Sequence, residues 1–443
     1  MLKVMHHICC GIDVHKRFVV ATLVTTSATG VATYETKKFG TFNDELTQLN
    51  VWLLKNGCYH VCMESTGKYW IPVYNVLEDM ITITLANPKY VKAIKGKKTD
   101  KKDSIWIADL HRHGLVPGSF IPPQDVRKLR DLCRYRTKLV GNRSSEKNRV
   151  QNSLTMCNLA ISHVLSDTFG KTAQRIIEYV LTCDKFDPEY CKTLIDGRVK
   201  ADHDEIIRSI VGYQLSLDQV AKIRFANNHF NFLNETLDLL DKRIIEFSEP
   251  FAPQIELLSS IPGLTQTSAT RIIAEIGIDM NTFHSAKHLC SWAGLVPQNN
   301  ESAGKKKSVK ISRAGVYLKP LLVQCANAAV KSNLEPYFKD KYEKIKKRRG
   351  HKKAIIAIAR MMLTCCYHMI LKNEVFKPVD THKLTEQHKK KIQERRLNNA
   401  IHFLKISGFS VSINPDSTID QSNFDLSNLN GVADHLNISS QLE

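Results

Sequence analysis

The segment HICCGIDVHKRFVVATLVTT, residues 7–26, decides the fold of the N-terminal region. An apolar run leads to Asp13, a polar HKR turn follows, and a β-branched run begins at Phe18, so the segment predicts two consecutive strands. VATYETKKF predicts a third strand, VCMES a fourth and buried strand, and ITITLAN a fifth. Helical spacing separates the last three strands, first after Asn43, which can cap a helix, and then over residues 69–80.

This order predicts an α/β domain with a mixed sheet over residues 1–123, the order that ribonuclease-H-like nucleases such as RuvC use. Residues 124–250 predict long, charged, amphipathic helices, which suit a coiled coil between protomers, an arm along nucleic acid or a plain helical bundle. Residues 251–373 predict a second, mainly helical unit. Its IPGLTQTSATRIIAEIG segment resembles a helix-hairpin-helix that binds DNA backbone, with a structural helical hairpin as the alternative. The polar segment 374–443 predicts a flexible tail. The fold class is therefore α/β + α.

Charge limits the classes of function. The chain has 443 residues, a formal net charge of +19 and a pI of about 9.3. The positive charge gathers in the runs GKKTDKK, RKLRDLCRYR, GKKKSVK and KIKKRRGHKK. Such clustering favours a nucleic-acid partner over a charge that serves only solubility.

The 12 cysteines have irregular spacing and lie mostly in apolar stretches, which predicts buried, reduced thiols. Cys58, His60 and Cys62 invite a zinc interpretation, but no second cysteine or histidine pair at finger-like spacing follows them. We find no signal-peptide pattern and no apolar run long enough to cross a bilayer. We therefore expect a reducing, cytoplasmic location where DNA is accessible, with no membrane partner.

Four acidic residues form the first candidate site. Asp13 and Glu64 each end a predicted strand, and strand ends converge on one edge of an open sheet. Asp100 and Asp103 share one face of the first turn of a helix that Thr99 can cap. Magnesium prefers a few carboxylates and completes its shell with water and phosphate oxygens, and two such ions can stabilise phosphoryl transfer.

Plainer explanations exist for single members of this group. Asp13 can be a turn residue, and Asp100 and Asp103 can serve the helix dipole. Glu64 is more telling, because an unpaired charge at the end of an apolar strand is costly. Neighbouring lysines can neutralise the acids or hold phosphates: Lys97, Lys98, Lys101 and Lys102.

Five stretches together carry a family resemblance: GIDVHK, MESTGKYW, NPKYVKAIKGKKTDKKDSIWIADL, IPGLTQTSATRIIAEIG and FHSAKHLCSWAGLVPQNNESAGKKKSVKISRAGVYLKPLL. In combination they resemble the DEDD-type insertion-sequence transposases, the bridge-RNA-guided recombinases of the "one-ten" insertion-sequence family, over residues 8–155 and 255–372. The resemblance implies an N-terminal RuvC-like domain and a C-terminal transposase domain joined by helices. Four departures are visible. SAG stands where the family has a serine followed by two glycines, the DxxDA motif reads DKKDS, the helical middle is longer than expected, and the tail beyond 374 is extra.

The resemblance also implies a site and partners. It assigns the metal-binding acids to Asp13, Glu64, Asp100 and Asp103, with Mg²⁺ as cofactor and Mn²⁺ as a substitute, and the nucleophile to Ser302. The implied chemistry is cleavage and exchange of DNA strands through a covalent phosphoserine link. A structured non-coding RNA would pair with donor and target DNA. The protein would be a homo-oligomer, a dimer or tetramer, in which one protomer's acids face another's serine.

Ser302 by itself is an ordinary loop serine, and its hydroxyl needs activation to act as a nucleophile. The basic side chains that follow it are candidates to hold a scissile phosphate: Lys305, Lys306, Lys307 and Arg313. Three interpretations stay open at this point. The chain is an RNA-guided recombinase, a RuvC-type nuclease in which the acids activate water, or a basic nucleic-acid-binding protein without catalysis.

Overall fold

The computed structural model describes residues 3–65, 67–91, 99–297, 300–302, 305–308, 310–332, 336–378, 390, 397 and 401, with the backbone alone at 89, 90, 300–302 and 305–308. The chain forms two compact units, Met1–Phe376 and Lys377–Glu443. The predicted flexible tail lies outside the described residues beyond 378, apart from the three single positions.

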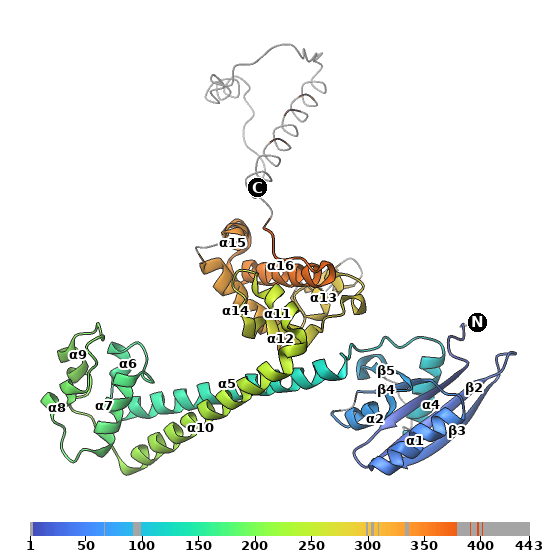
Figure 1. Ribbon diagram of the computed structural model, residues 1–443, viewed down its shortest axis with the longest axis horizontal. Helices are drawn as coiled ribbons and strands as arrows, with labels where there is room; N and C mark the ends of the chain where they lie inside the picture. The colour runs from blue at the N-terminus through green and yellow to red at the C-terminus, as the bar shows by residue number, and fades with distance from the viewer. Residues whose placement is uncertain are drawn as a thin grey trace. The chain divides into compact units, whose positions relative to one another are not determined.

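The N-terminal sheet has five strands: β1 (Ile8–Val14), β2 (Phe18–Thr26), β3 (Ala32–Gly40), β4 (His60–Glu64) and β5 (Thr82–Ala86). Their order is β3-β2-β1-β4-β5, with β1, β2 and β3 antiparallel and β1, β4 and β5 parallel. β1 is central and buried on both faces, which explains why its sequence is a continuous apolar run without alternation. The predicted mixed α/β sheet is confirmed (Figure 1).

Helices cover both faces of this sheet. The apolar residues of α1 (Asn43–Lys55) and α2 (Trp70–Leu77) pack with one face in a single hydrophobic cluster. α4 (Asp100–Arg112) packs on the other face, where Ala108 joins residues of β1 and β2. The short α3 (Pro88–Val91) follows β5. The expected cap of α1 is wrong: Phe42 is the N-cap residue and offers no side-chain acceptor, because Asn43 already has its place in the helix.

Gly11 allows α4 to lie close against β1. A Cβ atom added at Gly11 would come within 2.3 Å of the Ala108 nitrogen and of the Ser104 carbonyl oxygen. Both atoms belong to the backbone of α4, so a flexible side chain cannot move away to make room. The distance between β1 and α4 therefore depends on this glycine.

We expect Gly11→Ala to destabilise the protein by about 1–3 kcal/mol or more, because overpacking forces the helix from the strand. Gly141→Ala is the matched control, since no atom lies within 4 Å of its added Cβ in the middle of a helix. That change should stabilise by roughly 0.5–1 kcal/mol. Urea unfolding measures both free energies, and equal effects would contradict the close approach.

Two long helices form the middle of the chain, α5 (Gln124–Met156) and α10 (Leu217–Ser248) (Figure 1). They pack through Leu139, Leu233 and Leu237 and through an ion pair between Arg136 and Asp241. The chain between them folds into a small helical module with its own core. Its helices are α6 (Ile161–Val164), α7 (Lys171–Thr182), α8 (Pro188–Thr193) and α9 (His203–Arg208). The sequence predicted helices here but not this separate core.

The C-terminal part of Met1–Phe376 is mainly helical. Its elements are η1 (Glu249–Phe251), α11 (Ala252–Ser259), α12 (Gln266–Ile276), η2 (Met280–Thr282), α13 (Ala286–Trp292), β6 (Asn300–Ser302), β7 (Lys305–Ser308), α14 (Leu318–Lys331), α15 (Tyr337–Arg349) and α16 (His351–Lys372). The predicted helix, turn and helix are present as α11 and α12. Gly263 in the turn has φ 85°, and its added Cβ would lie 2.6 Å from the Cys325 carbonyl oxygen on α14. This glycine therefore serves the packing of α14, and DNA binding by the hairpin stays a prediction.

α16 corrects one expectation. It is long and apolar enough to span a membrane, although no such run was expected from the sequence. Its inward residues, among them Ile358, Met362 and Cys366, lie in the largest hydrophobic cluster. A helix that is apolar enough to span a membrane is therefore, in this protein, a helix of the folded core. All 12 cysteines are free, and ten are buried, as predicted.

Candidate active site

Asp13 and Glu64 lie at the same edge of the sheet. β1 and β4 run parallel with Ile12 opposite Met63, and the two acids are the next residue on each strand. Ile12 and Met63 point into the core beneath α1 and α2. Successive side chains of a strand point to opposite faces, so both acids point to the face that α4 covers. The predicted convergence of the two strand ends is present.

The first turn of α4 brings two more carboxylates to this face. Thr99 caps the helix as predicted, since its Oγ1 accepts a hydrogen bond from the Lys102 nitrogen at 3.3 Å. Asp100 and Asp103 follow in the first turn. One turn along, the buried Ser104 hydroxyl hydrogen-bonds to that of Thr22 on β2 at 2.7 Å. This bond and the close approach at Gly11 fix the helix start above the sheet edge.

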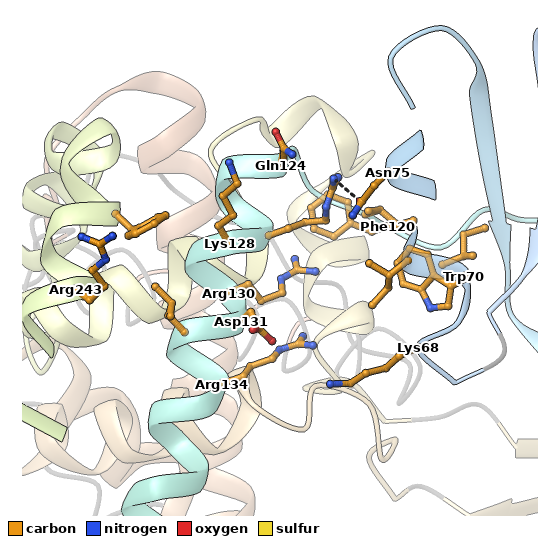
Figure 2. A pocket seen from close by; sticks show the side chains of 16 residues that line it. Lys68, Trp70, Asn75, Phe120, Gln124, Lys128, Arg130, Asp131, Arg134 and Arg243 are labelled. Carbon is orange, nitrogen blue, oxygen red and sulfur yellow. Dashed lines mark hydrogen bonds between the residues drawn. The ribbon is translucent and has the colours of Figure 1, made fainter. Parts of the chain in front are cut away.

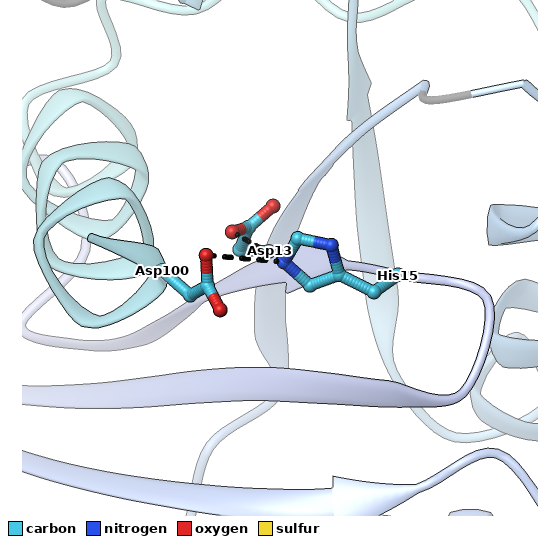
Figure 3. A group of neighbouring side chains, drawn as sticks. All are labelled: Asp13, His15 and Asp100. Carbon is cyan, nitrogen blue, oxygen red and sulfur yellow. Dashed lines mark hydrogen bonds and ion pairs between the residues drawn. The ribbon is translucent and has the colours of Figure 1, made fainter. Parts of the chain in front are cut away.

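His15 joins the acids, although it is not among the site residues predicted from the sequence (Figure 3). Its Nε2 lies 3.1 Å from Asp13 Oδ2 and 3.5 Å from Asp100 Oδ1. One ligand atom from each of the three residues lies within 4.8 Å of the others. Among the described residues this is the tightest group of metal-binding side chains, and Glu64 and Asp103 are outside it. A histidine in a turn after a strand is hard to predict as a site residue from the sequence, because His15 contacts α4 only once the sheet has folded.

The electrostatics of the group favour a cation. Burial raises the pKa of Asp13, and the charges of Asp100 and Asp103 raise it further, while His15 lowers it through its charge and its hydrogen bond. Asp100 and Asp103 therefore lie close enough to oppose the ionisation of Asp13. A divalent cation bound between them would offset that repulsion.

The donor set fits a hard divalent metal. Carboxylate oxygens suit Mg²⁺ and Mn²⁺, and Asp13 and Asp100 are already within reach of one ion. Glu64 leaves the neighbouring strand toward the same face, and Asp103 is close enough to act on the pKa of Asp13. Imidazole nitrogen is a better ligand for softer metals than for Mg²⁺. His15 therefore fits a positioning role toward the two carboxylates.

We expect His15→Ala to move the pH midpoint of Mg²⁺ binding upward. Asp13 binds a cation only when it is deprotonated, and removal of His15 removes the influence that lowers its pKa. Calorimetric titration with Mg²⁺ between pH 5 and 8 measures the midpoint. His163→Ala, in the helical module, is the control. A midpoint that stays unchanged or moves downward in His15→Ala would contradict this role.

The structure describes the predicted basic residues to different extents. Lys101 and Lys102 lie exposed on the first turn of α4, beside the acids in sequence. Arg313 is also exposed. Lys97 and Lys98 lie outside the described residues. For Lys305, Lys306 and Lys307 only the backbone is described. Their contact with phosphate stays a prediction.

Ser302 ends a short hairpin strand. β6 and β7 pair antiparallel, with Ser302 opposite Lys305 and Glu301 opposite Lys306, and with a register shift between Asn300 and Glu301. The serine backbone thus stands at the tip of a hairpin, directly before its turn, with lysines on the returning strand. Its side chain lies outside the described residues, so its distance to the acids is not defined.

Two glycines hold the base of this hairpin. Gly294, in the AGLVP stretch, and Gly315, in the RAG stretch, both have positive φ, 70° and 68°. A Cβ atom added at Gly315 would lie 2.1 Å from the Ala293 carbonyl oxygen, and one at Gly294 would lie 2.5 Å from the Ala314 carbonyl oxygen. The two stretches therefore contact backbone to backbone. Closer to the hairpin, Pro297 and Ile311 form an isolated antiparallel bridge.

Two family models match the chain. Residues 10–158 match a transposase model, DEDD_Tnp_IS110, and residues 255–343 match the transposase IS116/IS110/IS902 family. The first match contains all four acids, and the second contains Ser302. The two domains of the resemblance thus appear as separate matches, the first of which extends to the end of α5 and the second of which begins after α10.

Curated relatives agree with these models. The chain is similar to the transposase for insertion sequence element IS1111A of Coxiella burnetii, with 25% identity over 73% of this chain and 80% of the relative. It is also similar to the pilin gene-inverting protein of Moraxella lacunata, with 23% identity over 83% of this chain and 96% of the relative. Among solved structures, the Thermus thermophilus RuvC structure matches 25% of this chain and 99% of its own, with 12% identity and a TM-score of 0.21. The chain belongs to the DEDD-type transposases of the IS110 family.

Proposed function

We propose that this transposase exchanges DNA strands through a covalent link between DNA and Ser302, with magnesium held by Asp13, Glu64, Asp100 and Asp103. The observation that carries the proposal is the meeting of two strand ends and one helix start, with Asp13 and Asp100 within reach of one ion. The family match supports a DNA substrate, and the relative named for inverting a pilin gene supports rearrangement of DNA.

The acids have a binding role in this proposal. When bound there, the metal would stabilise negative charge on the attacking and leaving oxygens of a phosphodiester. Asp13 and Glu64 offer oxygens from the rigid sheet, and Asp100 and Asp103 offer them from a helix that Thr99 caps. Because these oxygens are held in place before the reaction begins, the protein does not have to reorganise as the transition state forms. Manganese accepts the same oxygen ligands and is a substitute.

In the serine step one phosphodiester bond is exchanged for another, so the energy of the bond is kept. The bond from Ser302 Oγ to phosphorus forms as the bond from phosphorus to one deoxyribose oxygen breaks. The serine proton passes to solvent, and the leaving oxygen takes up a proton. One phosphodiester replaces another, so a second DNA end can reverse the step and rejoin the strands without ATP. The lysines of β7, which stand opposite Ser302 and Glu301 in the hairpin, are candidates to hold the phosphate.

The proposal includes a structured guide RNA that pairs with donor and target DNA. It rests on the family resemblance, and the net charge of +19 is compatible with it because such a charge favours a nucleic-acid partner. Base pairing would carry the sequence specificity, and the protein would contact shape and backbone. Binding of both nucleic acids should weaken steeply with salt, and a flat response in filter binding would contradict it.

A homo-oligomer is also part of the proposal. α10 exposes Phe225, Phe232 and Leu239 at spacings of seven residues, with 73%, 61% and 68% of each side chain accessible. Its other face packs on α5. An apolar stripe at heptad spacing suits a second helix from another copy. Phe232→Asp should shift sedimentation velocity toward the monomer, and Asn231→Asp, an exposed position of α10 turned about 100° away from Phe232, is the control. An equal distribution in both variants would contradict this interface.

A hydrolytic nuclease is the second candidate function, because Asp13 and Asp100 lie within reach of one ion, and an ion held there could activate water. One assay separates the two. The protein, its RNA, donor DNA and target DNA are incubated with Mg²⁺ and analysed on a denaturing gel. DNA linked to protein supports the proposal. Free nicked ends without an adduct favour hydrolysis by water, and retained RNA binding without cutting favours a non-catalytic protein.

A further inference from the structure

A cavity of about 780 Å³ opens beside the sheet, between α2, the segment after β5, and helices α5 and α10 (Figure 2). We propose that it binds one unpaired nucleotide of a single strand, with the base against Trp70 and the phosphate near Arg130 and Lys128. This inference rests on the proposed function in one respect, the nucleic-acid substrate. The volume lies within the range of sites that enclose a small organic ligand.

The walls combine aromatic and aliphatic surface with positive charge. Trp70, Phe120 and Phe247 line the cavity together with Ile71, Leu85 and Ile121. Six basic side chains line it as well, Lys68, Arg127, Lys128, Arg130, Arg134 and Arg243, against the single acid Asp131. A nucleotide has the matching chemistry, a flat apolar base and an anionic phosphate.

Carboxylates pair with only part of this positive charge. Arg127 donates to Glu78 at 2.9 and 2.5 Å, and Arg134 donates to Glu275 at 2.7 and 2.8 Å. Arg243 pairs with Glu246. These three arginines hold the walls in place and bring little net charge.

Arg130 differs from them. Its Nε and one terminal nitrogen donate to the carbonyl oxygens of Ala274 and Glu275, at 2.9 and 2.6 Å. Among the described residues no carboxylate forms an ion pair with it. Burial lowers its pKa to about 10, so the guanidinium is still charged at neutral pH. The Glu275 carboxylate acts on Arg130 electrostatically but is paired with Arg134, and the Arg130 guanidinium also lies 5.5 Å from the centre of the Phe120 ring. A partly desolvated cation without an ion pair of its own is a favourable neighbour for a phosphate.

Trp70 is the available stacking surface. Phe120 is already enclosed, because its ring centroid lies 4.9 Å from that of Phe283 and 5.7 Å from that of Trp292. Trp70 is half-buried and packs in part against the core of the sheet, and its ring lies nearly perpendicular to that of Tyr74, at 5.7 Å and 86°. Figure 2 shows Trp70 and Lys68 reaching into the cavity from the sheet side, across from Arg130 and Arg134 on α5. A base can lie between the indole and these guanidinium groups.

The enclosure selects an unpaired nucleotide. Bases within a duplex are stacked on their neighbours and cannot reach an indole in a recess, whereas a single strand or an extruded nucleotide can. Trp70 also begins the helix after β4, the strand that ends at Glu64. The nucleotide site is thus linked through one short connection to the candidate metal centre. The same chemistry is found in single-stranded DNA and in RNA.

The test uses 2-aminopurine, whose fluorescence falls when it stacks, at the centre of short single-stranded DNA and RNA oligonucleotides. The full-length protein is titrated into each. We expect saturable quenching. The oligonucleotide that binds more tightly, DNA or RNA, identifies the nucleic acid that the cavity binds. Trp70→Ala should weaken binding by roughly five- to 150-fold, the range for loss of one base stack. Trp70→Phe should restore most of the affinity.

Lys128→Glu and Lys138→Glu form a matched pair, because both lysines are exposed on α5 and only Lys128 lines the cavity. Binding should weaken more in Lys128→Glu. Equal losses in the pair, an absence of quenching with both oligonucleotides, or equal competition by duplex DNA would overturn the proposal. Thermal melting of each variant confirms that it is folded. The covalent-adduct assay on wild-type protein reports the proposed function separately, so an adduct without quenching overturns the cavity alone.

Discussion

Ser302→Ala is expected to abolish formation of the protein–DNA adduct. The bond to phosphorus needs the serine oxygen, and a methyl group cannot replace it. The hairpin of β6 and β7 is held by backbone pairing and by the close approach of Gly294 to Ala314 and of Gly315 to Ala293, so the loss of one hydroxyl should leave its geometry intact. The adduct is measured on a denaturing gel with radiolabelled donor DNA.

The matched control is Ser291→Ala, which removes an exposed hydroxyl from α13 nearby in sequence. It should form the adduct at the wild-type rate. Affinity for the guide RNA should stay unchanged in both variants. If Ser302→Ala forms the adduct as fast as Ser291→Ala does, another residue is the nucleophile.

Asp13→Asn has the second large effect. This change keeps the size of the side chain and removes the charge that a divalent cation needs. Metal stabilisation of phosphoryl transfer contributes several kcal/mol, so strand exchange should fall by roughly a thousandfold or more. Stability in the absence of metal should be equal or higher, because burial and the neighbouring acids already oppose ionisation of Asp13.

Asp79→Asn controls for the change of charge, because Asp79 is an exposed carboxylate after α2, outside the acidic group. Mg²⁺ binding by calorimetry gives a readout independent of catalysis. It should be lost in Asp13→Asn and kept in Asp79→Asn. Normal strand exchange by Asp13→Asn would show that the metal assignment is wrong.

The sheet was predictable because its signals are local. Strands with β-branched runs, such as β2, and the short distances between them show directly in the sequence. The acids were predictable for the same reason: Asp13 and Glu64 end such strands, and Thr99 caps the helix that carries Asp100. Sequence order and strand geometry together imply that these residues meet.

The remaining features depend on contacts between distant segments. His15 reaches Asp100 only because Gly11 lets α4 approach β1. The cavity at Trp70 is lined in part by α5 and α10, so no local sequence pattern predicts it. α16 has the composition of a membrane helix and lies in a core, which only the surrounding helices reveal. Ser302 depended on family resemblance, because a serine in a polar turn has no distinctive pattern.

The role of Ser302 as nucleophile is tested by identifying the amino acid that carries the DNA. The adduct from wild-type protein, guide RNA and DNA is digested with protease and nuclease, and the linked peptide is sequenced by mass spectrometry. We expect a phosphodiester on Ser302, in the peptide that contains NNESAGK. A nucleotide linked to any other side chain, or cleaved DNA whose ends are all free, would contradict it.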